Sequence, residues 1–250
     1  MANARWFLGG LLLIISFEKI VFCMEEKFEK RKENIRLLLT TALVKKDAEA
    51  REREYRRSFM RFRELGYKNP LVVEGVQASA PSFFEEYTDA ADVYYYPNGR
   101  SSDKNRGKFE GLSMAAGLEK FGLSEESYIY KQTGRYFATR DLAEVVKEHP
   151  GFDAYLKRDG HHGIVLLVGY LWRGGKLLEM LRSLDYGAME REYDPKNPKP
   201  AMIETHVTDY VKKAEQEKKL DVKWIEGLLG ILVNPANSST GLLSSDQVKY

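Results

Sequence analysis

The sequence contains one cysteine, Cys23, among 250 residues, only eight prolines and almost no net charge. A single cysteine excludes an intramolecular disulfide framework and any zinc site built from several cysteines. The 39 basic and 37 acidic residues nearly cancel, to a formal charge of +2, which is typical of a mixed, solvated surface and not of a nucleic-acid-binding face. What the chain does have is a large hydrophobic fraction, 43%, with 15 tyrosines and 12 phenylalanines, enough to bury the core of one α/β domain.

The N-terminal apolar run is short for a membrane-spanning helix. It covers residues 6–17 after Arg5, whereas a spanning helix needs about 20 apolar residues. This length fits the hydrophobic region of a signal peptide that is cut before Met24. Three interpretations therefore stay open: an exported protein with a cleaved signal over residues 1–23, a membrane anchor over residues 6–22, or a cytoplasmic protein whose translation starts at Met24.

Apolar runs alternate with helical patterns over the first 140 residues. We expect strands at IRLLLTTALV (35–44), at LVVE ending with Glu74, at VYYY before Pro97, and from Tyr128. Helices are predicted between them, at residues 45–67 and 108–121, closed by Gly66 and Gly122. This alternation predicts an α/β fold with a mostly parallel central sheet and helices on both faces.

The second half of the chain is less regular. A core strand is predicted within residues 161–172, and helices within 175–184 and 202–219. We expect residues 35–235 to form a single α/β domain, after a charged lead-in at 24–34 and before a loosely ordered tail at 236–250. The adjacent His161 and His162 would point to opposite faces of a strand, so they do not predict a metal site.

Polar side chains end four of the predicted strands. Because the carboxyl ends of parallel strands form one edge of a sheet, where open α/β sheets bind ligands, these residues are the first candidates for a site: Thr40, Thr41, Glu74, Asn98 and the segment 131–135. Lys131 and Arg135 would project two cations beside Thr133 and Gly134, an arrangement that suits a diphosphate. The alternative is a surface turn with two solvated cations.

Two further segments supply candidate groups. The loop before the 108–121 helix, with Asn105, Arg106 and Gly107, could direct backbone N–H groups at an anion. The acidic segments DYGAMEREY and MIETH offer a general base, with Glu190 preferred to Glu204. The alternative for each acid is an ordinary surface carboxylate.

The stretch KNRGKFEGLSMAAGLEKFGLSEESYIYKQTGRY, with LVVEGVQ before it and the acidic segments after it, resembles a glycosyltransferase-like family of bacteria and large DNA viruses. The most specific part of the resemblance is KQTGRY. It implies a GT-A type, Rossmann-like nucleotide-sugar fold over roughly residues 35–213. It also implies sugar transfer from a nucleotide-diphosphate donor to a glycan, a lipid-linked acceptor or another hydroxyl.

The resemblance also implies roles for individual residues. Thr40 and Thr41 would lie near the nucleoside, Asn105, Arg106 and Gly107 would border the donor, and Lys131, Thr133 and Arg135 would stand where many GT-A enzymes carry an Asp-x-Asp metal site. With Lys-Gln-Thr in that place, bound Mn²⁺ or Mg²⁺ stays an open expectation, and Lys131 with Arg135 would stabilise the leaving diphosphate instead. Two alternatives remain: a non-catalytic nucleotide-sugar binder, and an exported α/β protein that binds an anionic ligand.

Overall fold

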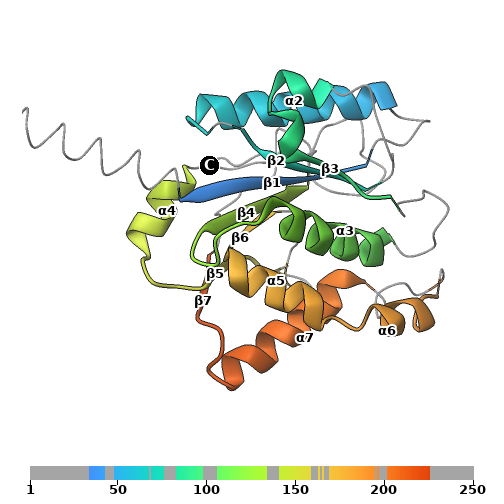
Figure 1. Ribbon diagram of the computed structural model, residues 1–250. Coiled ribbons are helices and arrows are strands. Elements are labelled where there is room, and N and C mark those ends of the chain that lie inside the picture. Colours follow the sequence, from blue (N-terminus) through green and yellow to red (C-terminus); the bar gives the residue numbers. More distant parts are fainter. Residues whose placement is uncertain are drawn as a thin grey trace, which may run out of the picture. The chain divides into compact units, whose positions relative to one another are not determined.

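Seven strands form one sheet in the order β3-β2-β1-β4-β6-β5-β7 (Figure 1). The computed structural model describes residues 34–42, 48–67, 69–75, 83–97, 106–133, 141–158, 163, 165, 169–194, 196 and 202–225. The strands are β1 (Ile35–Thr41), β2 (Leu71–Glu74), β3 (Val93–Tyr95), β4 (Tyr128–Thr133), β5 (Ala154–Leu156), β6 (Gly169–Arg173) and β7 (Val222–Trp224).

Six α-helices accompany these strands within the described ranges: α2 (Ala48–Glu64), α3 (Arg106–Phe121), α4 (Leu142–Glu148), α5 (Gly174–Ser183), α6 (Tyr186–Arg191) and α7 (Ile203–Gln216). Two 3₁₀ turns, η2 (Phe83–Glu86) and η3 (Ala90–Asp92), precede β3. The strands predicted at β1, β2, β3 and β4 are confirmed, as are the helices at α2, α3, α5 and α7. The short elements α4, α6, β5 and β7 were not predicted, because three to seven residues carry too little periodicity.

The order in which the chain adds strands to the sheet reverses beside β1. From β1 the chain adds β2 and then β3 on one side, and it returns to place β4 on the other side of β1. These four strands are parallel to one another, and β6 then pairs with β4 in the antiparallel direction. Open α/β sheets bind ligands where the order reverses in this way, at the carboxyl ends of the strands. Here that place is the end of β1 and β4.

Helices cover both faces of the sheet (Figure 1). On one face α2 packs against β4, where the rings of Phe62 and Tyr130 meet edge to face with centroids 6.0 Å apart. On the other face lie α3, α5 and α7. The predicted α/β fold with a mostly parallel sheet and helices on both faces is therefore confirmed, and the described residues from Ile35 onward belong to one compact unit.

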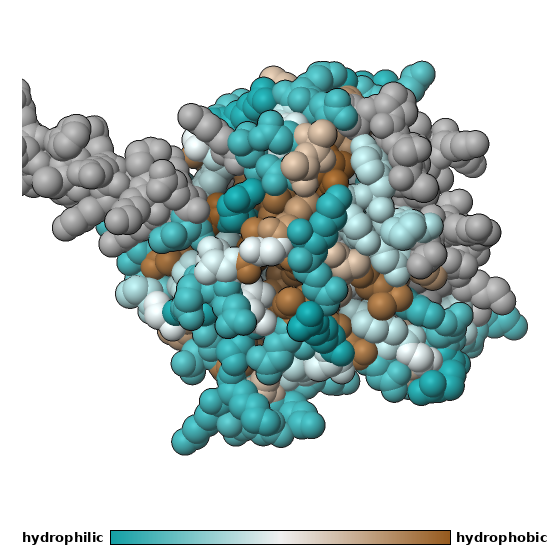
Figure 2. Space-filling model, viewed as in Figure 1, coloured by the Kyte–Doolittle hydropathy of each residue, from teal (hydrophilic) through white to brown (hydrophobic). Residues whose placement is uncertain are grey.

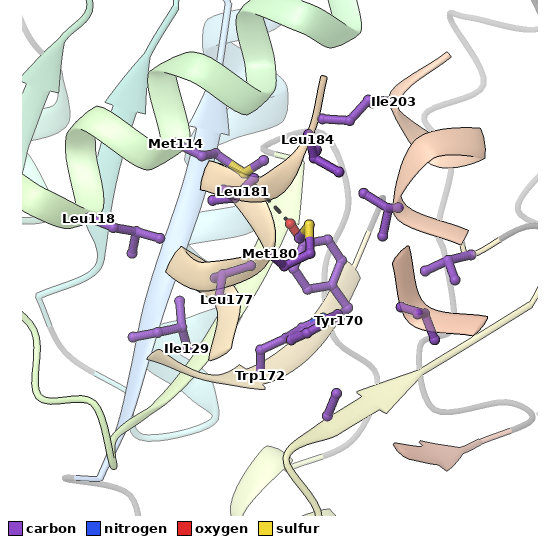
Figure 3. Close-up of a cluster of buried hydrophobic side chains, with 14 of the residues drawn as sticks. Met114, Leu118, Ile129, Tyr170, Trp172, Leu177, Met180, Leu181, Leu184 and Ile203 are labelled. Carbon is purple, nitrogen blue, oxygen red and sulfur yellow. Dashed lines mark hydrogen bonds between the residues drawn. The ribbon is translucent and has the colours of Figure 1, made fainter. Parts of the chain in front are cut away.

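The larger core lies on the face covered by α3, α5 and α7. Figure 3 shows Met114 and Leu118 of α3 opposite Leu177 and Leu181 of α5, with Tyr170 and Trp172 of β6 beneath them.

The outward side of α2, at the top of Figure 2, is largely hydrophilic, and it carries the exposed side chains of Arg53, Arg57 and Arg63. None of the helices within the described ranges is long and apolar enough to cross a membrane.

Two glycines that end helices behave as the sequence predicts. Gly66 adopts φ +83°, and the N–H groups of Gly66 and Tyr67 bond to the carbonyls of Arg63 and Phe62, which closes α2 with a Schellman motif. Gly122 ends α3 with φ +57°. The start of α3 differs from the prediction, since the helix begins at Arg106 and not at Lys108. Gly107 is therefore a helical residue and not part of a loop.

Candidate functional site

Thr40 and Thr133 stand side by side at the carboxyl ends of β1 and β4, as direct partners in the parallel register. Successive residues of a strand point to opposite faces of a sheet. Thr40 therefore shares the α3 face with Leu38, and Thr133 shares it with Ile129 and Lys131, whereas Thr41 points to the α2 face. Two separate groups of polar side chains consequently meet at this edge, one on each face.

Lys131 lies at the centre of the group on the α3 face. Its side chain is 0% exposed, and its Nζ donates hydrogen bonds to Glu110 Oε1 at 2.5 Å and to Thr133 Oγ1 at 3.0 Å. The same Nζ lies 5.6 Å from the ring centroid of Tyr170 on β6. The predicted free cation at the end of β4 is thus corrected: Lys131 is buried beneath α3, and its charge is paired with a carboxylate.

Glu110 of α3 is that carboxylate, and sequence reasoning missed it. Its Oε1 accepts from Lys131 and also from Thr40 Oγ1 at 2.9 Å. Burial acts to raise the pKa of Glu110, but the charge of Lys131 and the hydrogen bonds from Lys131, Thr40 and Thr133 outweigh it, so the pKa lies below the ordinary value. Glu110 is therefore ionised at neutral pH.

A signal for Glu110 does exist in the sequence. Glu110, Met114 and Leu118 follow one another at a spacing of four, so they occupy one stripe of the helix, and Met114 and Leu118 are core residues. A glutamate on an apolar stripe needs a buried partner. Lys131 carries the matching signal, because it follows the buried Ile129 on the same face of β4.

Glu204 reaches the same group from the first turn of α7. The approach depends on Gly107 and Gly111 of α3, where an added Cβ atom would lie 2.9 Å from side-chain atoms of Ile203. Burial is the main reason that the pKa of Glu204 is raised; the negative charge of Glu110 adds to it and Lys131 opposes it. Glu204 is thus close enough for these charges to act on it, and it binds a proton more readily than an exposed glutamate. We call Thr40, Glu110, Lys131, Thr133 and Glu204 the α3-face cluster.

The second polar group lies on the α2 face of the same edge and is fully buried. Thr41 Oγ1 donates to Glu74 Oε2 at 2.7 Å, and the hydroxyl of Tyr55 accepts from the N–H of Ala42 at 2.9 Å. One turn further, Gln132 Nε2 donates to Ser58 Oγ at 2.5 Å. All five side chains are at most 5% exposed: Thr41, Tyr55, Glu74, Ser58 and Gln132. We call them the α2-face network.

Glu190, the first candidate for a base, lies on α6 in a different setting. Its side chain is 68% exposed and forms an ion pair with Lys108 of α3. The hydrogen bond from Lys108, with the charge of that lysine, holds the pKa of Glu190 below its ordinary value. Of the two predicted bases, Glu204 therefore has the environment that favours proton uptake.

Several predicted site residues lie outside the described residues. These are Asn98, Asn105, Gly134 and Arg135, and for Arg106 only the backbone, at the start of α3, is described. Their roles remain sequence predictions. Gly107 is described, and its place in the structure is the contact with Ile203.

The described side chains do not fit a divalent cation at this edge. Among the residues that the structure describes, no group of three or more His, Cys, Asp or Glu could hold a metal. The oxygens that come together in the α3-face cluster, from Glu110 and Thr133, already surround the ammonium group of Lys131. An ion bound to the same oxygens would lie within a few ångströms of a positive charge, which it would repel.

A groove of about 760 Å³ lies elsewhere, near the amino end of β4. Its cations are already paired: Arg173 with Glu126 and Asp153, Lys176 with Glu179, and Arg182 with Glu119. The N–H groups of Gly174 and Gly175 at the start of α5 bond to loop carbonyls. This groove therefore offers less chemistry than the α3-face cluster.

No protein-family model matches the sequence, and no curated protein matches it. Solved structures that align with the chain include a glycosyltransferase involved in the glycosylation of the major capsid of PBCV-1, at 10% identity and a TM-score of 0.42, with 77% of this chain and 82% of that chain covered. Another is 4-diphosphocytidyl-2C-methyl-D-erythritol synthase, at 12% identity and a TM-score of 0.42, with 83% and 96% covered. A third is a protein of Desulfovibrio desulfuricans G20 assigned as a nucleotide-diphospho-sugar transferase, at 14% identity and a TM-score of 0.42, with 77% and 79% covered. Such values assign neither a family nor an activity, so the function has to be inferred from the chain's own residues.

Proposed function

We propose that the protein is a glycosyltransferase that moves a sugar from a nucleotide-diphosphate donor to a hydroxyl group of a glycan or a lipid-linked acceptor. One observation carries the proposal. At the reversal point of the sheet, the buried Lys131 forms an ion pair with Glu110, whose pKa is lowered, and Glu204 of α7, whose pKa is raised mainly by burial, lies near enough for both charges to act on it. Carboxyl groups whose environments push their pKa values apart are typical of sites that move protons. The family resemblance of the KQTGRY segment supports a nucleotide sugar as the substrate.

The reaction assigns a separate task to Glu204. A direct displacement forms a bond between the acceptor oxygen and the anomeric carbon, and it breaks the bond from that carbon to the diphosphate oxygen. The electron pair leaves with the nucleoside diphosphate, and the hydroxyl proton of the acceptor must go to a base. Glu204 is the proposed base, because a carboxylate with a raised pKa accepts a proton more readily at neutral pH.

The departing diphosphate needs positive charge nearby. Lys131 contributes to the field at the edge, but its hydrogen bonds go to Glu110 and Thr133. Arg135, which follows β4 in the sequence, therefore remains the predicted direct ligand of the diphosphate, with Asn105 and Arg106 beside it. Thr41, predicted near the nucleoside, and Glu74, predicted as a site residue at the end of β2, are buried and bond to each other, so we assign them to the fold of this edge and not to a contact with the donor.

The test measures binding and turnover separately. Wild-type protein is screened against UDP-, GDP- and dTDP-sugars, first by thermal shift, because a ligand that binds the folded state raises the melting temperature, and then by sugar release. Glu204→Gln should keep donor binding and lower kcat by about 10²- to 10⁴-fold. Glu64→Gln, on the exposed end of α2, is the matched control and should leave both unchanged.

The outcomes separate the proposed function from its alternatives. Donor binding without release or transfer of sugar by the wild type would indicate a non-catalytic nucleotide-sugar binder. No binding of any nucleotide or nucleotide sugar would overturn the proposal and leave the anionic-ligand protein as the better interpretation.

A further inference from the structure

The two charged partners at the centre of the α3-face cluster differ in access to solvent. The side chain of Lys131 is 0% exposed, whereas that of Glu110 is 28% exposed. Lys131 therefore has no surface that a ligand could contact in this conformation, whereas part of the Glu110 side chain has. Of the pair, the anion and not the cation is the group that a bound molecule would touch.

The charge of the cluster leads to the same conclusion. Lys131 contributes +1 and Glu110 contributes −1, and Glu204 adds −1 or 0 according to its protonation. The sum is never positive. A diphosphate placed against this group would meet a carboxylate with no surplus cation among these three described residues, and like charges at short range repel.

The orientation of Glu110 is also fixed before any ligand arrives. Lys131 and Thr40 both donate to Oε1, from two neighbouring strands, so the carboxylate cannot turn freely. An ionised carboxylate only accepts hydrogen bonds. Its natural partner is a neutral group with several donors, and the hydroxyl groups of a sugar ring fit that description.

We propose that Glu110 contacts the hydroxyl groups of the transferred sugar, so that the end of β1 and β4 is a sugar subsite and the diphosphate lies farther along the edge. This assignment rests on the proposed function. It makes Glu110 the residue that distinguishes a nucleotide sugar from the bare nucleotide. Lys131 and Thr40 are positioning residues that hold Glu110 and keep it ionised.

The experiment compares a nucleotide sugar with its nucleotide. The probe is whichever of UDP-, GDP- and dTDP-glucose gives the largest thermal shift, together with the matching nucleoside diphosphate, and the dissociation constants are measured by calorimetry. Wild-type protein should bind the nucleotide sugar more tightly than the diphosphate. Glu110→Gln should weaken binding of the nucleotide sugar by about 10- to 100-fold, the loss expected for hydrogen bonds to a charged group. It should leave the diphosphate unchanged within about threefold.

A second variant protects the test against misfolding. Because Glu110→Gln leaves a buried lysine without its counterion, Glu110→Gln with Lys131→Met removes both charges and should show the same selective loss. Nucleotides that carry singly deoxygenated glucose supply an independent check, since the analogue that lacks the contacted hydroxyl should bind wild type about as weakly as the complete sugar binds the variants.

The results distinguish the inference from the proposed function. If Glu110→Gln weakens binding of the diphosphate and of the nucleotide sugar equally, or weakens binding of neither, Glu110 does not contact the sugar. Donor binding by the wild type would still support a transferase in that case. If wild-type protein binds no nucleotide sugar, both the proposed transferase activity and the proposed sugar subsite are wrong.

Discussion

The two faces of the sheet use the same edge for different purposes. On the α2 face, Thr41 and Glu74 belong to a network whose side chains are at most 5% exposed, and they bond to one another. On the α3 face, Thr40 bonds to Glu110, whose side chain is 28% exposed. Two consecutive threonines of β1 thus belong to two environments. Adjacent residues of a strand point to opposite faces of the sheet. Thr41 therefore belongs to a buried network that stabilises the fold, whereas Thr40, one position earlier, bonds to a residue that a ligand can contact.

The comparison of the two faces predicts the largest loss of stability for a substitution of Lys131. Lys131→Met keeps the length of the side chain but leaves Glu110 with an uncompensated charge, so the free energy of unfolding should fall by about 3–5 kcal/mol. Gln132→Leu, the neighbouring residue on the α2 face, loses hydrogen bonds between neutral groups and should cost about 1–3 kcal/mol. Urea denaturation of both variants measures the difference.

A double-variant cycle isolates the interaction of Lys131 with Glu110. Lys131→Met combined with Glu110→Gln should cost clearly less than the sum of the two single changes, because the buried charge that each single variant strands is then absent. Additive costs, or a cost below about 1 kcal/mol for Lys131→Met, would contradict a buried ion pair at this position.

The adjacent threonines provide a more direct comparison of the two faces. Thr41→Val should lower the free energy of unfolding by about 1–3 kcal/mol, since it removes a donor from the buried Glu74, and it should leave affinity for the nucleotide sugar within about twofold. Thr40→Val should cost less stability, because Glu110 keeps its bond to Lys131, but it should weaken the nucleotide sugar by about tenfold. Thermal unfolding and calorimetry of the two variants suffice. A loss of affinity in Thr41→Val would instead place the nucleoside contact on the α2 face, with Thr41 and Glu74.

The sequence was sufficient for the parallel strands β1–β4 and for part of the site. Apolar runs with polar ends located β1, β2 and β4, and strand direction explains why Thr40 and Thr133 meet. It was not sufficient for the state of Lys131, because that state depends on Glu110, which lies 21 residues earlier and on a helix. Nor did it reveal why Glu204 differs from Glu190. That difference comes from the packing of Gly107 and Gly111 against Ile203. The periodicity of a single segment does not predict how two elements pack against each other.

The raised pKa of Glu204 predicts how the free energy of unfolding depends on pH. Its pKa is raised in the folded state, mainly by burial, so the folded protein binds the proton more tightly than the unfolded chain does. The free energy of unfolding therefore falls as the pH rises through the interval between the ordinary pKa and the folded one. Glu204→Gln cannot ionise, and it should be more stable than wild type at pH 7–8. This advantage should shrink as the pH is lowered to about 4, where Glu204 of the wild type binds the proton in the folded protein and, for the most part, in the unfolded chain.

Glu64→Gln serves as the control for that measurement, because it makes the same chemical change at an exposed position on α2. If Glu204→Gln is less stable than wild type at pH 8, burial is not the dominant influence on Glu204, and the case for Glu204 as the base weakens accordingly.

The smallest effect is expected at Glu190, the other predicted base. The carboxylate of Glu190 in its ion pair with Lys108 is exposed to solvent, which screens the attraction, so Glu190→Gln should barely change the melting temperature. If Glu204 accepts the acceptor proton, Glu190→Gln should also keep kcat within about twofold, whereas Glu204→Gln loses two orders of magnitude or more. Measuring both variants on one donor makes the comparison decisive. A large loss in Glu190→Gln together with a small loss in Glu204→Gln would move the chemistry from the α3-face cluster to α6, and the carboxylate with the lower pKa would then have to act as the base.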